Sequence, residues 1–203
     1  RDAEELLKGD PVLIDCRPPA AFGKAHIDGA YHIGLSSQLS SWAGRVIPYG
    51  KPLLLLLENE DRLPEVSRQL IRVGLDHVVG YVEGGIEAWE KAGLPLSQLP
   101  QISVHQLKER LDRETDLLVL DVRTDREWKE GHISNALHIP VTEIPDHQGQ
   151  LDQDQKIAVI CGSGYRSSIS ASILQRHGFR QLYNVSGGMG AWKSVHYPET
   201  RGE

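Results

Sequence analysis

The chain has 203 residues, of which 39% are hydrophobic and 25% are charged, and its formal net charge is -6. With a mean hydropathy of -0.35 and a pI near 5.8, this composition is typical of a globular protein and excludes a disordered one. The basic residues are scattered along the chain, which argues against a nucleic-acid-binding surface. The longest aliphatic run, residues 53–57, is far shorter than the roughly 20 apolar residues of a membrane-spanning helix, so we expect no membrane segment.

The cysteines and the first residue limit the cellular setting. Cys16 and Cys161 are far apart, and no CxxC pair or His/Cys cluster at metal-ligand spacing is present. We therefore expect no disulfide, no metal site and a reducing, cytoplasmic compartment. The sequence has no signal peptide and begins with Arg1 rather than Met, as a trimmed part of a longer protein would.

The chain contains one internal repeat. The segment LIDCRPPAAFGKAHIDGAYHI (13–33) matches VLDVRTDREWKEGHISNALHI (119–139) at an offset of 106 residues, and VEGGIEAWEKAG (82–93) matches VSGGMGAWKSV (185–195) at an offset of 103. The copies meet in GLPLSQLPQ (93–101), where prolines and a helix-stopping glycine interrupt the periodicity. We predict a linker there and two domains, 1–97 and 98–203.

In chain order, the second copy alternates helical and strand patterns. Residues 103–111 begin with a serine and carry a glutamine three residues later, a capping box that predicts a helix. The apolar runs 117–121, 156–160 and 181–185 predict strands, and a helical pattern follows each of the last two. This alternation predicts an α/β protein with two tandem domains, each a mostly parallel sheet flanked by helices on both faces.

The loop CGSGYR (161–166) directly follows the second of these strands. Its two glycines let the backbone curl so that consecutive N–H groups point inward. These amides, the dipole of the following helix and the guanidinium of Arg166 would stabilise an anionic sulfur. Because free cysteine ionises near pH ~8.5 and such surroundings favour the thiolate, we expect Cys161 to be a nucleophile rather than an inert core thiol.

The motif CGSGYRS (161–167) after a strand, together with Asp-x-Arg, GHI-x-x-A and GG-x-x-AW, resembles the rhodanese family over nearly the whole chain. The resemblance implies a sulfurtransferase that needs no cofactor and moves sulfane sulfur from thiosulfate or a thiol persulfide to a thiol or cyanide. By position, Cys161 is implied to form the persulfide. The implied substrate-binding residues are Gly162, Ser163, Gly164, Tyr165, Arg166 and Ser167, the last of which opens the helix.

The spacing of Cys161 and Arg166 separates two related chemistries. Cysteine phosphatases resemble C-x5-R, a loop with room for a tetrahedral phosphate or arsenate, whereas this chain has C-x4-R. Ile160 also stands where protein tyrosine phosphatases typically have His. We therefore expect sulfur transfer rather than phosphate-ester hydrolysis or arsenate reduction.

The first copy lacks the nucleophile. Alignment places Leu57 opposite Cys161, and the loop LENEDR (57–62) has three carboxylates where the second copy has its two glycines and tyrosine. An anion-binding loop becomes an anion-repelling one. The first domain is therefore predicted to be a catalytically inactive rhodanese-like domain with a structural, docking or regulatory role.

Residues that recur in both copies are interpreted as structural. We expect ion pairs at the strand ends, hydrogen-bonded histidines in the core, and tryptophans that anchor the last helix of each copy. These residues are Asp15 with Arg17, Asp121 with Arg123, His26, His132, Trp89 and Trp192. Cys16 is expected in the core, and Trp128 and Tyr165, which only the second copy has, at the rim of a pocket.

Two wider interpretations remain open. The order of an inactive and then an active copy resembles the C-terminal part of fusions that begin with a metallo-β-lactamase-fold persulfide dioxygenase or hydrolase, so an upstream domain of that fold is a candidate partner. The given sequence contains no HxHxDH metal motif. The alternative function is a non-enzymatic interaction or redox-sensing module in which Cys161 is at most a sensor.

Overall fold

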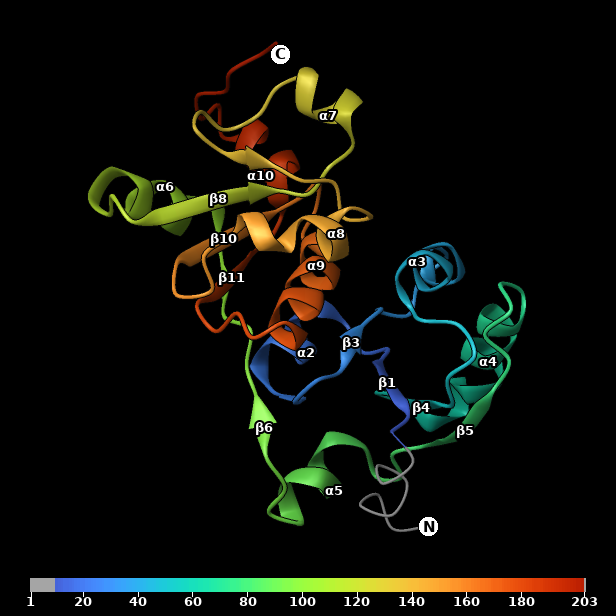
Figure 1. Ribbon diagram of the computed structural model, residues 1–203. Coiled ribbons are helices and arrows are strands. Elements are labelled where there is room, and N and C mark those ends of the chain that lie inside the picture. The colour runs from blue at the N-terminus through green and yellow to red at the C-terminus, as the bar shows by residue number, and fades with distance from the viewer. Residues whose placement is uncertain (1–9, 203) are drawn as a thin grey trace. The chain divides into compact units, whose positions relative to one another are not determined.

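The structure is a computed structural model that describes residues 10–202. The chain separates into two compact units, Arg1–Gln98 and Leu99–Glu203. Each unit is a parallel sheet with helices on its faces (Figure 1), as the repeat predicts. Among the described residues, no helix has the length and apolar character needed to cross a membrane.

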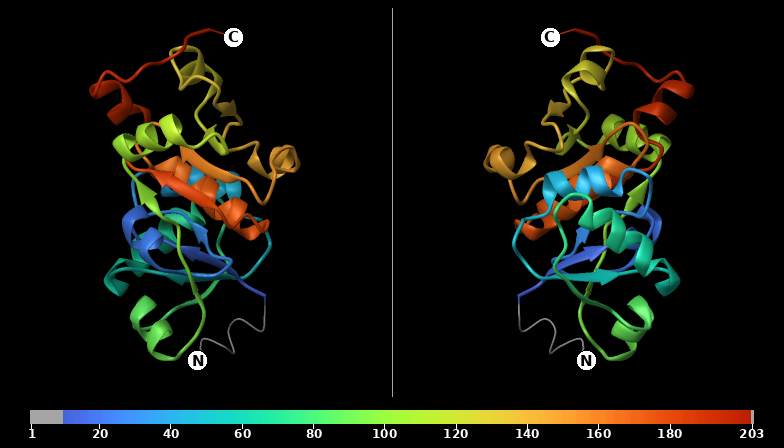
Figure 2. Two further views of the ribbon diagram at one scale, coloured as in Figure 1. Left: turned by 90° about the vertical axis from the view of Figure 1, so that its left-hand side faces the viewer. Right: turned by 90° about the vertical axis from the view of Figure 1, so that its right-hand side faces the viewer.

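In the N-terminal unit, the strand order is β3-β1-β4-β5 and all neighbours are parallel. The strands are β1 (Val12–Asp15), β3 (Tyr31–His32), β4 (Leu53–Leu56) and β5 (Val78–Tyr81), and the helices are α2 (Pro19–Lys24), α3 (Leu39–Val46), η1 (Glu60–Arg62), α4 (Leu63–Ile71) and α5 (Gly85–Lys91). The four leucines of β4 are buried because both faces of this central strand are covered. Figures 1 and 2 show α3 and α4 on one face and α5 on the other.

In the C-terminal unit, the order is β7-β11-β10-β8-β9, again all parallel. The elements are β7 (Gln101–Ile102), α6 (Val104–Arg113), β8 (Leu117–Asp121), α7 (Asp125–Lys129), β9 (Leu137–His138), α8 (Ile144–His147), η2 (Gln148–Gln150), β10 (Lys156–Ile160), α9 (Tyr165–Arg176), β11 (Leu182–Val185) and α10 (Gly188–Ser194). Helices α6 and α10 contact each other on one face, and α8 and α9 on the other. The capping box predicted for α6 is confirmed, because Ser103 and Gln106 bond reciprocally.

The predicted linker, residues 93–101, contains one short strand and the first residue of another. Leu96–Ser97 forms β6, which pairs antiparallel with β2 (His26–Ile27) inside the N-terminal unit. Gln101–Ile102 forms β7 and joins the sheet of the C-terminal unit. The prolines and glycine interrupt the local pattern as expected, but two-residue strands form through pairing with remote partners that the local sequence does not reveal.

The pairing of residues between strands shows which positions of the two copies are equivalent. Asp15 lies beside Leu56 in the first unit, and Asp121 lies beside Ile160 in the second. The residue that follows the central strand is therefore Leu57 in one unit and Cys161 in the other. Both stand at the carboxyl end of a central parallel strand, where α/β proteins gather their binding residues.

Candidate active site

Cys161 lies inside the loop between β10 and α9. Its Sγ accepts hydrogen bonds from the amide of Gly164 at 3.1 Å and from the hydroxyl of Ser167 at 3.4 Å. The residue is fully buried. Gly164 adopts a φ of 103°, in a region that only glycine enters readily, and this turn brings its amide over the sulfur. The thiol is thus buried but faces two polar donors.

The carbonyl groups of the loop are bound on the side away from the sulfur. Amides at the start of α10 and the side chain of Asn184 donate to four consecutive carbonyls. The bonds run from Met189 N to Cys161 O (2.7 Å), Gly190 N to Gly162 O (2.9 Å), Gly187 N to Ser163 O (3.1 Å) and Asn184 Nδ2 to Gly164 O (3.1 Å). Since N–H and C=O point in opposite directions in a trans peptide, this arrangement turns the amides of residues 162–165 away from α10.

Gly188 makes this close approach possible. A Cβ atom at this position would lie 2.3 Å from Cys161 O and 2.7 Å from Ser163 N. Its φ of 52° adds a second reason for glycine. A glycine of the GG-x-x-AW motif therefore lets α10 pack closely against the loop. Trp192 of the same motif is buried and donates from Nε1 to Pro198 O at 3.0 Å.

Arg166 is held by a residue that the sequence pattern did not single out. Its Nη1 and Nη2 donate to the two carboxylate oxygens of Glu127 at 2.7 and 2.6 Å. The pairing with Glu127 raises the pKa of Arg166. A Cβ atom on Gly162 would lie 3.1 Å from Nη2, so the guanidinium covers that part of the loop. The guanidinium thus lies over the loop, and its hydrogen bonds go to Glu127.

The repeated ion pairs are confirmed as structural. Arg123 donates from Nε and Nη2 to Asp121 at 2.6 to 3.0 Å and also to Gly131 O at 2.8 Å. Arg17 bonds Asp15 and the carbonyl of residue 25 in the same way. All four side chains are buried. Each pair ties the end of a strand to the loop eight residues further on.

The repeated histidines and tryptophans also occupy the predicted core positions. His26 and His132 are buried, and the Nδ1 atom of each hydrogen-bonds the carbonyl of the aromatic residue four positions earlier. Trp89 and Trp192 are buried too.

The aromatic side chain at position 128 has a counterpart in the first unit, so its contacts are not specific to the second copy. Trp128 stacks on His132 and His138, with ring centroids 3.5 and 4.7 Å apart. Phe22 likewise contacts His26 and His32, with ring centroids 3.8 and 4.6 Å apart, and is stacked on the first ring and tilted against the second. A stack that both units contain is explained by folding.

The other predicted loop residues differ in exposure. Ser163 is exposed, while Gly162, Tyr165 and Arg166 are half-buried, and Gly164 and Ser167 are buried. The solvent-accessible part of the loop is therefore formed by Gly162, Ser163, Tyr165 and Arg166.

Both copies of the repeat match one known family. The Rhodanese-like domain matches residues 1–92 and 103–195. The chain belongs to the rhodanese family. The chain is similar to YtwF of Bacillus subtilis strain 168, which is named as a sulfurtransferase, and to GlpE of Coxiella burnetii, which is named as a thiosulfate sulfurtransferase.

The relatives each match about half of this rhodanese chain. It is 38% identical over 102 residues to YtwF, and the match covers 50% of this chain and 98% of that protein. It is 34% identical over 110 residues to YrkF of the same organism, named as a sulfur carrier protein, and the match spans only 57% of YrkF. A crystal structure of a rhodanese-related protein from Thermoplasma volcanium is 33% identical, with a TM-score of 0.46, and covers 50% of this chain and 97% of that one.

The first rhodanese unit has a different loop at the equivalent position. Leu57 is buried where the second unit has Cys161. The helix is preceded by a 3-10 turn in which Asn59 accepts from the amide of Asp61 at 2.9 Å. Glu60 Oε1 accepts from the amide of Gly84 at 2.7 Å, whereas the equivalent amide of the second unit binds a loop carbonyl.

A cavity of about 320 Å³ adjoins this loop of the first unit. Its lining includes the carboxylates of Glu58, Glu60 and Glu87, together with Arg17. Two of the three acidic residues of the loop LENEDR (57–62), Glu58 and Glu60, thus line this cavity. Cys16 lies in the core as predicted, and burial raises the pKa of its thiol.

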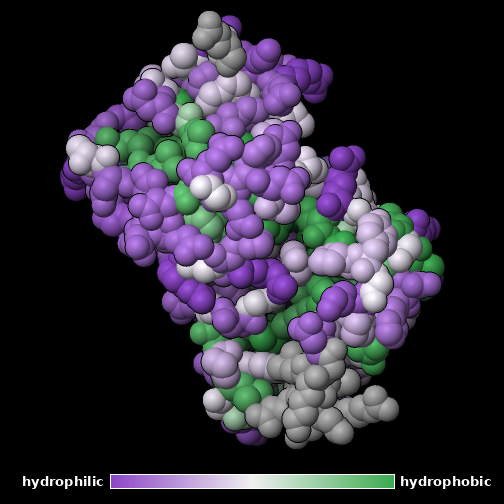
Figure 3. All heavy atoms as spheres, viewed as in Figure 1, coloured by the Kyte–Doolittle hydropathy of each residue, from purple (hydrophilic) through white to green (hydrophobic). Residues whose placement is uncertain are grey.

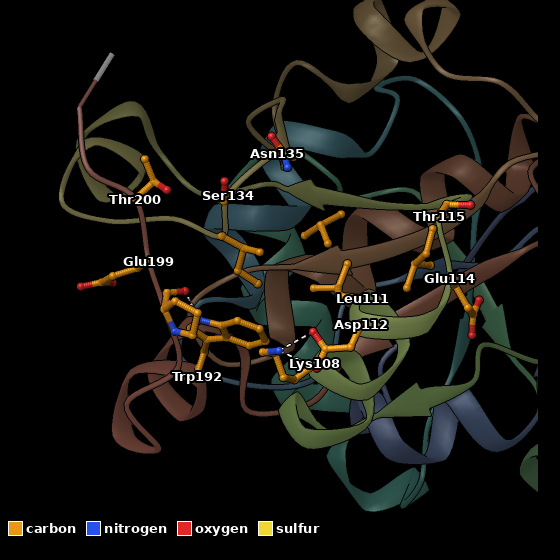
Figure 4. A pocket seen from close by; sticks show the side chains of 14 residues that line it. Lys108, Leu111, Asp112, Glu114, Thr115, Ser134, Asn135, Trp192, Glu199 and Thr200 are labelled. Atoms are coloured by element: carbon orange, nitrogen blue, oxygen red, sulfur yellow. Dashed lines mark hydrogen bonds and ion pairs between the residues drawn. The ribbon is translucent and has the colours of Figure 1, made fainter.

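A cavity of about 370 Å³ in the C-terminal unit has no residue of the loop 161–167 in its lining. Figure 4 shows its lining, with Lys108, Leu111 and Asp112 of α6 on one side and Trp192 and Thr200 on another. In Figure 3, hydrophobic side chains gather over α6 and β8, which supply part of its apolar floor. No group of three or more metal-ligating side chains occurs within residues 10–202.

Glu127 is the residue of this site that the sequence reasoning did not single out, although a signal was present. Thr124 and Glu127 have the same spacing as Ser103 and Gln106, and they form a second capping box at the start of α7. That pattern predicts a helix start. Only the fold brings the same carboxylate to Arg166, 39 residues further along the chain.

Proposed function

We propose that the C-terminal unit, residues 98–203, is the sulfurtransferase of this chain and that Cys161 carries the sulfur. The observation that supports it is the pair of hydrogen bonds that Sγ accepts from Gly164 N and Ser167 Oγ. Donors aimed at a buried sulfur stabilise its anionic form, whether thiolate or persulfide. The loop carbonyls, bound to α10 and Asn184, leave the opposite side of the loop to the sulfur.

The proposed reaction has two displacement steps. The Cys161 thiolate attacks the sulfane sulfur of thiosulfate or a thiol persulfide, the S–S bond of the donor breaks, and its electron pair leaves with sulfite or the thiolate. Cys161 then carries a persulfide anion. A cyanide ion or a second thiolate attacks the terminal sulfur, thiocyanate or a new persulfide forms, and the Cys161 thiolate is released.

The N-terminal unit is proposed to have no transfer activity. Leu57 offers no nucleophile at the end of β4, and the adjoining cavity contains the carboxylates of Glu58 and Glu60, which repel an anionic donor. A structural, docking or regulatory role for this unit fits its retained ion pair and histidine stack.

Replacement of the proposed nucleophile tests the function. Cys161→Ser should abolish thiocyanate formation from thiosulfate and cyanide, and it should abolish the gain of about 32 Da in intact mass that a persulfide produces. Cys16→Ser is the matched control, because its buried thiol has no place in the reaction, and it should keep both signals.

Two outcomes would refute this proposal. One is an unchanged thiocyanate yield from the folded Cys161→Ser chain, which would favour a non-enzymatic module. The other is the absence of sulfur transfer in the unaltered chain combined with turnover of an aryl phosphate, which would favour a phosphatase.

A further inference from the structure

Arg166 is the only basic residue of the loop CGSGYRS (161–167). Its guanidinium lies over Gly162 and is paired through both terminal nitrogens with Glu127. The side chains of this pair are 18% and 25% exposed, so water screens the two charges only in part. A bidentate pair of this kind places a full negative charge directly beside the only cation of the loop.

The carboxylate of Glu127 is fixed from two sides. Besides Arg166, it accepts from Thr124 N at 3.1 Å and from Thr124 Oγ1 at 2.8 Å. The hydrogen bonds from Arg166, followed by those from Thr124, lower the pKa of Glu127 to about 2, so it is ionised at neutral pH. The pair therefore contributes little net charge at the loop.

Comparison of the two copies distinguishes the Glu127–Arg166 pair from the ion pairs that the fold requires. Asp121–Arg123 has a full counterpart in Asp15–Arg17. Glu127, in contrast, corresponds to Ala21 at the offset of 106.

The capping and cation positions also differ between the copies. Thr124 corresponds to Pro18 at the same offset. Arg62, the counterpart of Arg166, lies at the end of η1 and pairs instead with Glu65 in the adjoining α4. The Glu–Arg pair thus occurs with the cysteine loop and is absent from the unit that folds without it.

We propose that Glu127 is a specificity-determining residue that cancels the charge of Arg166 and so favours sulfur donors of low negative charge over the thiosulfate dianion. The inference rests on the proposed sulfurtransferase function and assigns it a class of donor. If Arg166 stood alone, the mouth of the loop would carry a full positive charge and would favour the dianion. Glu127 acts through Arg166 and touches neither the sulfur nor the donor.

The test of this specificity uses two sulfur donors that differ in charge but release chemically similar leaving groups. Thiosulfate is a dianion that releases sulfite, and methanethiosulfonate is a monoanion that releases methanesulfinate. The measured quantity is the ratio of their kcat/KM values in the full chain with cyanide as acceptor. Glu127→Gln should raise this ratio in favour of thiosulfate by about tenfold at low salt, since it adds one positive charge near the donor. The gain should shrink at 0.3 M salt.

Three control variants separate a local charge effect from a change in net charge or in packing. Glu130→Gln changes the net charge equally, but its side chain is 62% exposed and faces Arg126, so the ratio should stay at the original value. Glu127→Asp keeps the negative charge, so it should also leave the ratio of the two kcat/KM values at the original value. The double variant Glu127→Gln/Arg166→Gln restores a neutral pair, and its ratio should return toward that of the unaltered chain.

The outcomes are distinguishable from a failure of the proposed function. A chain that gains no sulfur on Cys161 from either donor refutes the function itself. If sulfur is loaded but Glu127→Gln leaves the ratio unchanged or lowers it, the specificity role is refuted and only a structural role remains. If Glu127→Gln does not fold, the double variant Glu127→Gln/Arg166→Gln and the variant Glu127→Asp test the proposal instead. A changed ratio of the two kcat/KM values in either variant overturns it.

Discussion

At the scale of single residues, glycine determines whether the cysteine loop can be built. Gly188 and Gly85 occupy equivalent positions, and both have positive φ angles, 52° and 65°. A Cβ at Gly188 would lie 2.3 Å from Cys161 O, whereas one at Gly85 would lie 3.7 Å from Leu57 O. The backbone strain is similar in the two units, but the close approach occurs only in the second.

We therefore expect unequal effects from the same substitution. Gly85→Ala should cost about 1–2 kcal/mol of unfolding free energy from its backbone angle alone. Gly188→Ala should cost about 1–3 kcal/mol more, because the new methyl group displaces the loop, and it should also reduce sulfur transfer. Urea denaturation and cyanolysis of both variants measure the two effects. Equal losses of stability with unaltered transfer would show that the contact of Gly188 with the loop is unimportant.

At the scale of elements, each unit joins α2 or α7 to its sheet through an aromatic ring that packs against two histidines. The rings of Phe22 and Trp128 serve the same purpose, although one unit has the cysteine loop and the other does not. His32 and His138 extend each stack and bond the carbonyl of the strand-end arginine at 2.9 Å. These contacts hold the segment that carries Glu127 in the second unit.

Trp128→Phe should therefore leave kcat and KM for sulfur transfer unchanged, because phenylalanine performs this task in the first unit. Trp128→Ala should lower the unfolding free energy by about 2 kcal/mol through the loss of stacking and apolar burial. Steady-state kinetics and thermal unfolding distinguish the two effects. A severalfold increase of KM in a stable Trp128→Phe chain would instead place the indole at the rim of the pocket.

Some of these helices and strands could be predicted from the local sequence, and others could not. The strand at 117–121, the strand at 156–160 and the capped helix after Ser103 were predictable because burial and capping leave a local pattern. The strands β6 and β7 were not, because each has two residues and forms by pairing with a remote strand. The pairing of Glu127 with Arg166 was missed for the same reason.

At the scale of the whole molecule, the duplication makes the first unit an internal reference for the second. One difference between the units is the buried His32, whose imidazole has a pKa lowered to about 4, chiefly by burial. In the unfolded chain, this histidine takes up a proton near pH ~6.5. The unfolded state therefore binds more protons than the folded state between these two values.

Stability should consequently fall as the pH decreases from about 6.5 to about 4, by up to ~1.4 kcal/mol per pH unit from this residue. Above pH ~6.5 the contribution of His32 is fully present. Urea denaturation at pH 7.0 and 5.0 measures the change, and His32→Gln, which does not titrate, should show a smaller difference between the two pH values. An equal difference in both chains would assign the pH dependence to other groups.

The sequence by itself determined the duplication, the α/β class, the position of Cys161 after a buried strand and the absence of a counterpart in the first copy. These features depend on residue type and on short spacings, which local periodicity and alignment of the copies make visible. Only the tertiary structure decided that the loop carbonyls bind α10, that Gly188 permits this approach and that Glu127 holds Arg166. Those contacts join residues that are remote in the sequence, and their geometry exists only once the parallel strands have aligned the loops at one edge of the sheet.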